Sequence, residues 1–244
     1  DGKLSVKWFC DQKYKNSQHL IQSNSKSLVA VLYGILVSRG LIDPEKVVTD
    51  YLPEFKGTVY EKVCVRYVAD MRVNLSFNDY QSMNHYVAAN GDSYELEQVD
   101  LYTGNSGWKT AFSFEEYTRK YLIEEENKIM TDHGAAFSYA SHHTNVIVRI
   151  MEKISGEPFH QIFEREIWSK IGANNDALFM INTFGESVGG EGGFSVTSMD
   201  MLRFAIAVQN QEFDAAAYYE RVHHRFDSTA LNPQNIIHKE HRKE

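Results

Sequence analysis

Several segments of this chain have apolar residues at helical spacing and are followed directly by a glycine. These segments constrain the fold more than any other feature of the sequence. Between Lys26 and Arg39 apolar residues recur every three or four positions, and Gly40 comes next. Such a pattern predicts an amphipathic helix that ends at a glycine, with Leu41 as the hydrophobic contact after it. Similar patterns end at Gly156 and Gly172. The middle of the chain is therefore predicted to be mostly helical, with helices over residues 26–39, 60–70, 114–127, 139–154, 158–170 and 199–209.

Two of these helices have recognisable starts. Ser113 is followed three residues later by Glu116, which is the spacing of a capping box. Thr197 stands where an N-cap belongs, and Asp200 occupies the third position of the helix that follows.

The two ends of the chain differ from this helical middle. Leu4–Phe9 roughly alternates apolar and polar residues, which predicts a strand. No glycine follows Gly193, and strands joined by tight hairpins usually need glycine at their turns. We therefore do not expect a sheet of short hairpins near the C-terminus, where the tail from Asn235 is charged and rich in histidine.

Composition narrows the classes of function. Lys and Arg number 25 against 33 Asp and Glu, a net charge of −8. This disfavours nucleic-acid binding, which depends on surplus positive charge. The apolar runs are too short for a membrane span, and no signal-peptide pattern opens the chain, so cytoplasm and periplasm both stay open. The two cysteines, Cys10 and Cys64, form no disulfide framework and lack zinc spacing.

The sharpest local motif is Ser-x-x-Lys, formed by Ser23 and Lys26 where the first amphipathic helix starts. Residues three apart lie on one face of a helix, so the amine can reach the hydroxyl. The helix N-terminus and burial both disfavour a charged ammonium, so the lysine could act as a base. The alternative is an N-capping serine with an exposed lysine one turn later.

Two other segments stand out. Phe137–Ser141 places a tyrosine, Tyr139, at the predicted start of a helix, where a phenol could pass protons; the alternative is an ordinary core or surface tyrosine. Gly189–Ser195 holds four glycines but lacks the Gly-Lys-Ser/Thr of a phosphate loop. We interpret it as a tight turn before a helix cap.

Three pairs of histidines could suggest a metal-binding site, but their spacing does not support one. None of the pairs has the helical spacing and flanking glutamate of His-Glu-x-x-His, so surface or tail histidines explain them better and no metal or cofactor is expected. An Asp-His-Ser triad stays open by spacing, but no Gly-x-Ser-x-Gly elbow supports it. The pairs are His142-His143, His223-His224 and His238-x-x-His241.

Taken in order, these motifs resemble the serine β-lactamase-like superfamily of penicillin-binding proteins, class C β-lactamases and related esterases. Within it the chain is most similar to the 6-aminohexanoate-dimer (nylon-oligomer) hydrolases. The resemblance covers roughly residues 20–210. Its matching stretches are Ser23–Ser27, Gly40–Pro44, Val48–Glu54, Asp79-Tyr80, Ser106–Thr110, Phe137–Ser141 and Gly192–Thr197 with Asp200.

The resemblance implies roles for five residues. Ser23 would be the acylated nucleophile, Lys26 its general base, and Tyr139 the group that protonates the leaving amine or alcohol. Tyr80 and Trp108 would line the substrate pocket, although Trp108 could equally be a core aromatic in a glycine turn. The β-lactamase branch has Tyr-x-Asn, and Ser141 stands in place of that asparagine. This difference favours an esterase or amidase over a true β-lactamase.

The resemblance also implies an α+β fold, in which a mostly helical lobe packs against an antiparallel sheet. The family's third motif, Lys-Thr-Gly or a His-x-Gly variant, lies on a strand that supplies one oxyanion donor, and no such motif follows Gly193. We therefore expect a reduced sheet. The expected parts are a strand region leading to the nucleophile (1–25), a helical lobe with the active-site motifs (26–172), and a return segment, helix and charged tail (173–244).

Two functions follow from these features. The first is a serine hydrolase that cleaves a small amide or ester through an acyl-enzyme, without cofactor or metal. The second is a non-catalytic or truncated member of the fold with a binding or scaffold role. A homodimer stays open in either case.

Overall fold

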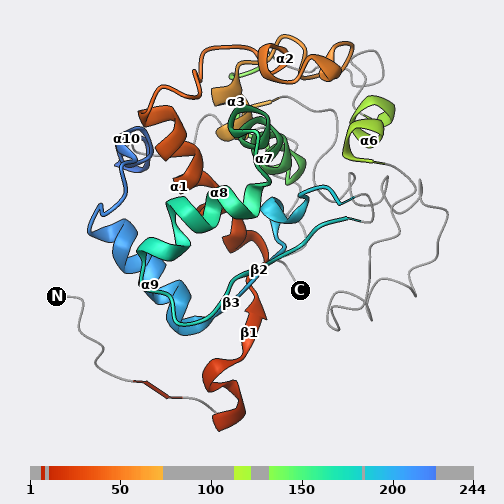
Figure 1. The fold of residues 1–244 in the computed structure, drawn as a ribbon. Coiled ribbons are helices and arrows are strands. Elements are labelled where there is room, and N and C mark those ends of the chain that lie inside the picture. Colours follow the sequence, from red (N-terminus) through yellow and green to blue (C-terminus); the bar gives the residue numbers. More distant parts are fainter. Residues whose placement is uncertain (1–6, 9–10, 74–112, 122–131, 183–184, 224–244) are drawn as a thin grey trace, which may run out of the picture.

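The computed structural model describes residues 7–8, 11–73, 113–121, 132–182 and 185–223. Two long helices, α1 (Ser25–Ser38) and α7 (His142–Ser155), lie at its centre, and shorter elements surround them (Figure 1). The other α-helices are α2 (Val48–Tyr51), α3 (Val65–Ala69), α6 (Phe114–Tyr121), α8 (Phe159–Glu166), α9 (Ser198–Gln209) and α10 (Ala216–His223). The 3-10 helices are η1 (Gln12–Asn16), η2 (Gln22–Asn24), η3 (Pro53–Phe55), η4 (Trp168–Lys170) and η5 (Gly189–Glu191).

Helix α1 confirms the prediction made from its apolar spacing. It is buried on nearly every side, which is typical of a central helix in a core. Gly40 adopts a left-handed φ of 69°, and the amide of Leu41 bonds to the carbonyl of Leu36 at 2.9 Å, closing the helix as expected. The side chain of Leu41, expected to cover the end of the helix, is half exposed, and the next residue, Ile42, is the one buried in the core.

Both predicted helix caps are confirmed. The hydroxyl of Thr197 accepts a hydrogen bond from the amide of Asp200, and Ser113 and Glu116 bond each other's amides at 3.2 and 2.9 Å. Asp200 is fully buried. Burial opposes its ionisation, but hydrogen bonds from Asn174, Asn175, Thr197 and Arg203 hold its pKa below the ordinary value. This carboxylate therefore ties α9 to Asn174 and Asn175, which lie more than 20 positions earlier in the chain.

Several helix boundaries differ from the predictions. Helix α7 begins at His142, not at Tyr139: residues 140–144 form a local turn, with the amide of His143 bonded to the carbonyl of Ala140, and the amide of Ser138 before them bonds to the carbonyl of Met71 at 2.7 Å. Residues 60–70 are helical only over α3. The helix expected over 158–170 is divided into α8 and η4 at Ile167. The last residues of the helix expected over 114–127 lie outside the described part of the chain.

The sheet in the described part is small and antiparallel, as expected. Its strands are β1 (Gln18–Leu20), β3 (Phe194–Thr197) and β2 (Leu178–Phe179), in the order β1-β3-β2. Gln18 lies opposite Thr197, and Leu178 lies opposite Ser195. Four rings, Phe159, Phe163, Phe179 and Phe194, pack together with centroids 4.8–6.1 Å apart and join α8 to the sheet.

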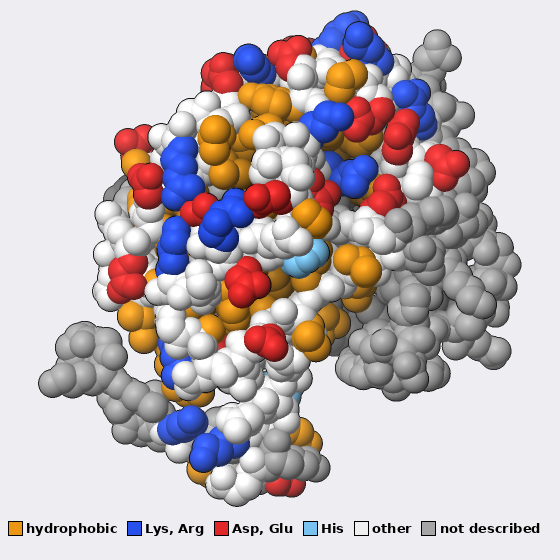
Figure 2. Space-filling view, viewed as in Figure 1, with side chains coloured by type: hydrophobic (Ala, Val, Ile, Leu, Met, Phe, Trp, Pro, Cys, Tyr) orange, Lys and Arg blue, Asp and Glu red, His pale blue; other side chains and the backbone are white. Residues whose placement is uncertain are grey.

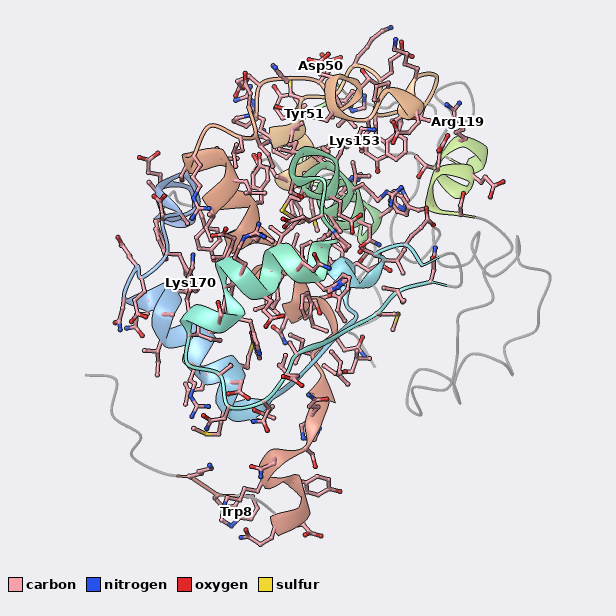
Figure 3. All side chains as sticks on the ribbon, viewed as in Figure 1. Trp8, Asp50, Tyr51, Arg119, Lys153 and Lys170 are labelled. Carbon is pink, nitrogen blue, oxygen red and sulfur yellow. The ribbon has the colours of Figure 1, made fainter. Side chains whose placement is uncertain are left out.

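The sequence did not indicate strand β1. The strand predicted over Leu4–Phe9 lies mostly outside the described residues, and Lys7 and Trp8 have no regular structure. Trp8 stands away from the helical body and is 78% exposed (Figure 3).

The surface over α2, α7 and α8 intermixes acidic and basic side chains, with apolar groups between them (Figure 2). None of the helices in the described part combines the length and apolarity that a membrane crossing requires.

Two adjacent histidines, His143 buried and His142 half-buried, join α7 to neighbouring segments. His143 is fully buried, and its Nδ1 lies 2.8 Å from the hydroxyl of Tyr60. His142 stacks on Phe114 at 4.4 Å, and its Nε2 lies 3.0 Å from Thr118 Oγ1. Burial lowers the pKa of each imidazole to about 3. Both rings are therefore neutral in the folded protein at neutral pH.

We expect the free energy of unfolding to fall as the pH drops below about 6.5. The unfolded chain then protonates both histidines while the folded chain does not, and each costs up to about 1.4 kcal/mol per pH unit. Urea unfolding at pH 7 and pH 5 measures this loss. His143→Asn should shrink it, whereas the exposed-residue control His160→Asn should leave it unchanged. Equal pH dependence in all three proteins would contradict the assignment.

Gly34 allows α10 to lie directly against α1. A Cβ at this position would lie 2.5 Å from Tyr218 Cβ. Gly34→Ala should therefore destabilise the protein by about 1–3 kcal/mol through overpacking, against a helix-propensity gain of about 1 kcal/mol. Thermal unfolding of a double-mutant cycle tests this. In a Tyr218→Gly background the loss should be smaller, because only the backbone of residue 218, at 3.2–3.3 Å, then meets the added methyl group. A loss of equal size in both backgrounds would rule out the contact with the Tyr218 side chain.

Candidate active site

Ser23 lies where the chain passes from strand β1 to helix α1. It occupies the middle of η2, and its side chain is exposed. Gln22 adopts a φ of 50°, an uncommon conformation for a residue other than glycine. Two bonds to β3 hold the turn: the amide of Ile21 donates to the carbonyl of Phe194 at 2.9 Å, and the amide of Phe194 donates to Ser25 Oγ at 3.2 Å. The sheet thus fixes where Ser23 is presented.

Lys26 reaches back from the first turn of α1 to Ser23. Its Nζ lies 3.1 Å from Ser23 Oγ and 2.5 Å from the backbone carbonyl of Glu191 in η5. The lysine is partly buried, so the alternative of an exposed lysine is wrong. The two contacts direct the amine at the serine, from an anchor 165 positions away in sequence.

Tyr139 approaches the same serine from a third segment. Its hydroxyl donates a hydrogen bond of 2.8 Å to Ser23 Oγ, and its ring centroid lies 5.1 Å from Lys26 Nζ. The preceding Ser138 is buried and bonds to Met71 through its amide, which fixes the approach of the tyrosine. The structure therefore brings together the three residues that the sequence selected, Ser23, Lys26 and Tyr139.

The glycine segment forms the tight turn that the sequence predicted, but it also carries a site group that the sequence did not reveal. The amides of Gly192 and Gly193 both bond to the carbonyl of Gly189. A Cβ on Gly190 would lie 2.7 Å from Val148 Cγ2, so only glycine lets the turn lie against α7. This close packing places the carbonyl of Glu191 at Lys26. A backbone carbonyl has no residue-type signature, and the flanking glycines were the only clue.

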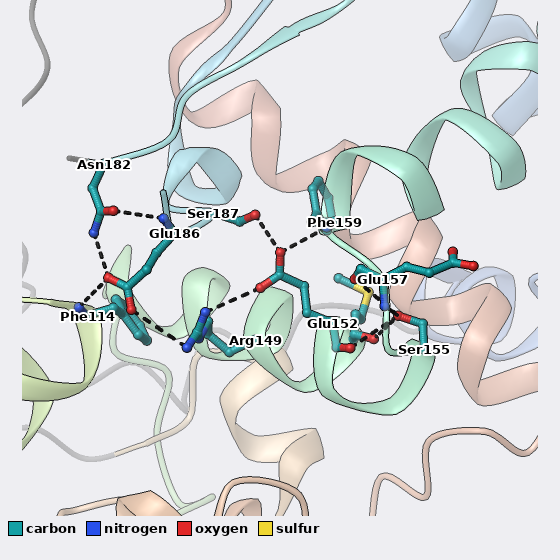
Figure 4. Close-up of polar contacts among 10 residues, drawn as sticks. Phe114, Arg149, Glu152, Ser155, Glu157, Phe159, Asn182, Glu186 and Ser187 are labelled. Carbon is teal, nitrogen blue, oxygen red and sulfur yellow. Dashed lines mark hydrogen bonds and ion pairs between the residues drawn. The ribbon is translucent and has the colours of Figure 1, made fainter. Parts of the chain in front are cut away.

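A polar network anchors the chain that leads into η5 (Figure 4). Glu152 accepts hydrogen bonds from Ser187 Oγ and the amide of Phe159. Glu186 accepts from the amide of Phe114 and from Asn182, and Arg149 bridges the two carboxylates at 3.5 and 3.7 Å. Asn182, Glu186 and Ser187 are thereby tied to α6, α7 and α8 just before the turn that holds Lys26.

The other predicted residues do not join this site. Tyr80 and Trp108 lie outside the described part of the chain, as do His224, His238 and His241. His142 and His143 bind separate partners rather than a common point. Among the described residues there is no group of three or more His, Cys, Asp or Glu side chains that could hold a metal ion.

Comparisons of the sequence with known proteins identify its relatives. The sequence profile named Beta-lactamase matches residues 14–236. A 6-aminohexanoate-dimer hydrolase from Paenarthrobacter ureafaciens is 30% identical over 190 residues, which are 77% of this chain and 44% of that protein.

Two solved structures share the fold. A putative 6-aminohexanoate-dimer hydrolase from Bacillus anthracis aligns with a TM-score of 0.65 at 19% identity, covering 87% of this chain and 53% of that one. A D-stereospecific amidohydrolase from Streptomyces sp. aligns with a TM-score of 0.65 at 13% identity, covering 90% and 68%. The chain thus spans about half the length of the two 6-aminohexanoate-dimer hydrolases. The helical lobe on an antiparallel sheet is the β-lactamase-like fold, and the sequence match shows that the chain belongs to the Beta-lactamase family.

Proposed function

We propose that the chain carries the nucleophilic centre of a serine hydrolase that cleaves an amide or ester through an acyl-enzyme. The observation that supports this most directly is the convergence of Lys26 Nζ and Tyr139 Oη on Ser23 Oγ, at 3.1 and 2.8 Å. An exposed hydroxyl with two proton-transfer groups within hydrogen-bond reach is the arrangement of an activated nucleophile. The family relatives named above are hydrolases or amidohydrolases, which fits the same chemistry.

The proposed reaction proceeds in two stages. Ser23 Oγ attacks the substrate carbonyl carbon while its proton passes to Lys26 Nζ as the general base, and the bond to the carbonyl of Glu191 keeps this amine in place. Tyr139 delivers its proton to the leaving amine or alcohol as the carbon–nitrogen or carbon–oxygen bond breaks, and Lys26 passes the proton taken from Ser23 on to Tyr139. A water molecule then attacks the acyl-enzyme and gives a proton to the same pair of groups, which return it to Ser23 Oγ as the bond between the acyl carbon and Oγ breaks and the acid is released.

Stabilisation of the oxyanion is the weaker part of this centre. Ser23 lies at the start of a helical segment, where backbone N–H groups have no partner within the helix, so its own amide is one candidate donor. Strand β3, the described strand after the glycine turn, is paired with β1 on one side and β2 on the other, so it is not a substitute for the family's third-motif strand. A missing donor costs about 10²–10³ in rate. We therefore expect acylation by reactive substrates to be easier to detect than steady turnover.

The paired state of β3 also favours the second candidate, a member of the fold that binds a ligand without turnover. Binding without Ser23-dependent hydrolysis of p-nitrophenyl acetate would support that role. Hydrolysis that disappears in Ser23→Ala would exclude it.

A fluorophosphonate probe should react with one residue, Ser23, and form a stable adduct on the hydroxyl that would carry the acyl group. Intact-mass spectrometry of the labelled protein should show a single adduct, absent from Ser23→Ala. Ser198→Ala is the matched control, because Ser198 is also an exposed serine in the first turn of a helix. Its labelling should equal that of the unmodified sequence. No adduct on the folded protein, or an adduct that survives in Ser23→Ala, would reject the proposal.

The loss of hydrolysis rate in Tyr139→Phe should depend on whether the leaving group needs a proton. A p-nitrophenolate leaves without a proton, so hydrolysis of the p-nitrophenyl ester should fall by about tenfold or less, whereas the alkyl ester of the same acid should lose about 10²-fold or more. Tyr51→Phe is the control, because this substitution also removes a phenol hydroxyl. Tyr51 belongs to α2, and its hydroxyl bonds to the backbone of Asp43 rather than to Ser23 (Figure 3). Equal losses for both esters would show that Tyr139 does not protonate the leaving group.

A further inference from the structure

The segment that leads into Tyr139 is bonded to the turn at the end of helix α3. The amide of Gly134 donates to the carbonyl of Arg72, and the amide of Ser138 donates to the carbonyl of Met71, both at 2.7 Å. Tyr139 is the next residue, and its hydroxyl bonds to the proposed nucleophile. The phenol is therefore supported through the backbone by a distant part of the sequence.

The turn that offers these two carbonyls is strained. Met71 has a φ of 53°, which lies in the left-handed region that residues other than glycine rarely adopt. The amide of Met71 bonds to the carbonyl of Val68, and the amide of Arg72 bonds to the carbonyl of Tyr67, so this turn closes α3. Such strain persists only where neighbouring contacts maintain it, and the two bonds from the segment before Tyr139 are contacts of this kind.

The ring of Tyr67 packs directly on Gly134. Gly134 has a φ of 85°, and a Cβ at this position would lie 2.5 Å from both Cε1 and Cζ of Tyr67. Only glycine lets the backbone lie this close to the ring. Arg66 holds the ring in place, because its guanidinium carbon lies 4.7 Å from the ring centroid and its Nη2 donates to the Tyr67 hydroxyl at 3.1 Å. The ring thus forms a fixed surface under the segment.

We propose that Tyr67 is a positioning residue for Tyr139: its ring, packed on Gly134, holds the segment that presents the phenol to Ser23. The proposal rests on the function proposed above, in which Tyr139 protonates the leaving group. The nucleophile and its base are held separately, by bonds to β3 and η5. Loss of the Tyr67 ring should therefore impair delivery of the proton to the leaving group and spare the attack by the serine.

The first test compares the hydrolysis of an alkyl ester with that of the p-nitrophenyl ester of the same acid. Tyr67→Ala should lower the alkyl-ester rate at least about tenfold more than the p-nitrophenyl-ester rate, because only the alkyl alcohol needs a proton as it leaves. Tyr67→Phe keeps the ring and should retain the original ratio of the two rates. Tyr51→Ala is the matched control, since it removes a half-buried tyrosine ring from another short helix, α2. A merely structural role would lower both rates alike in Tyr67→Ala, and this result would overturn the proposal.

A second variant approaches the same contact from the glycine. Gly134→Ala places a methyl group against the ring and should reproduce the selective loss of alkyl-ester hydrolysis. Gly57→Ala is its matched control, because Gly57 has a similar φ of 79° but no atom within 4 Å of an added Cβ. The control therefore imposes the backbone strain without the contact. The same ratio of ester rates in both variants would contradict the proposal.

A spectroscopic measurement tests the position of the phenol without catalysis. With 3-fluorotyrosine incorporated at position 139, Tyr67→Ala should shift or broaden the fluorine NMR resonance, whereas Tyr67→Phe and Tyr51→Ala should leave it in place. An unmoved resonance and an unchanged ester ratio, in a protein that a fluorophosphonate labels at Ser23, would reject the positioning role and keep the hydrolase. A shifted resonance in a protein without labelling or hydrolysis would reject the hydrolase and keep the positioning of the phenol by Tyr67.

Discussion

The antiparallel pairing of β1 with β3 is the contact on which the rest of the site depends. The strands are short, but their register places Leu20 opposite Ser195, and the turn after β1 therefore meets the turn before β3. Ser23 and Lys26 belong to the first turn, and Glu191 belongs to the second. Without this pairing the carbonyl of Glu191 would not reach Lys26, and the amine would have no anchor to direct it at Ser23. The aromatic cluster around Phe194 supplies the burial that three or four strand residues alone could not.

Sequence reasoning succeeded where structure is determined locally. The apolar period of α1, the caps at Thr197 and Ser113 and the glycine after Arg39 each depend on residues within one or two helical turns. The proximity of Ser23 and Lys26 is local in the same sense. The contact of Tyr139 with Ser23 spans 116 positions, so spacing alone could not predict it; the family resemblance did.

The failures have the opposite origin. Gln18–Leu20 has neither alternation nor β-branched residues, and it is a strand only because β3 offers it partners. Helix α7 starts three residues later than expected, and a bond from the amide of Ser138 to the distant Met71 holds the segment before it. Glu191 acts through its backbone, which no side-chain pattern reveals. Each of these features involves a contact with a segment far away in the sequence. A single sequence does not show which distant segments lie close together in the fold.

The left-handed turn at Gln22 shows how the fold holds the nucleophile in an unfavourable geometry. A non-glycine residue with positive φ costs of order 1 kcal/mol or more, and it persists only where its neighbours over-determine it. Here Ile21 and Ser25, on either side of the strained residue and of Ser23, are both hydrogen-bonded to Phe194. Relaxing Gln22 would break at least one of these bonds and would uncouple β1 from β3. The strain therefore cannot be released without losing the pairing that also anchors Lys26, and so the exposed position of Ser23 and the orientation of its base are maintained by the same two contacts.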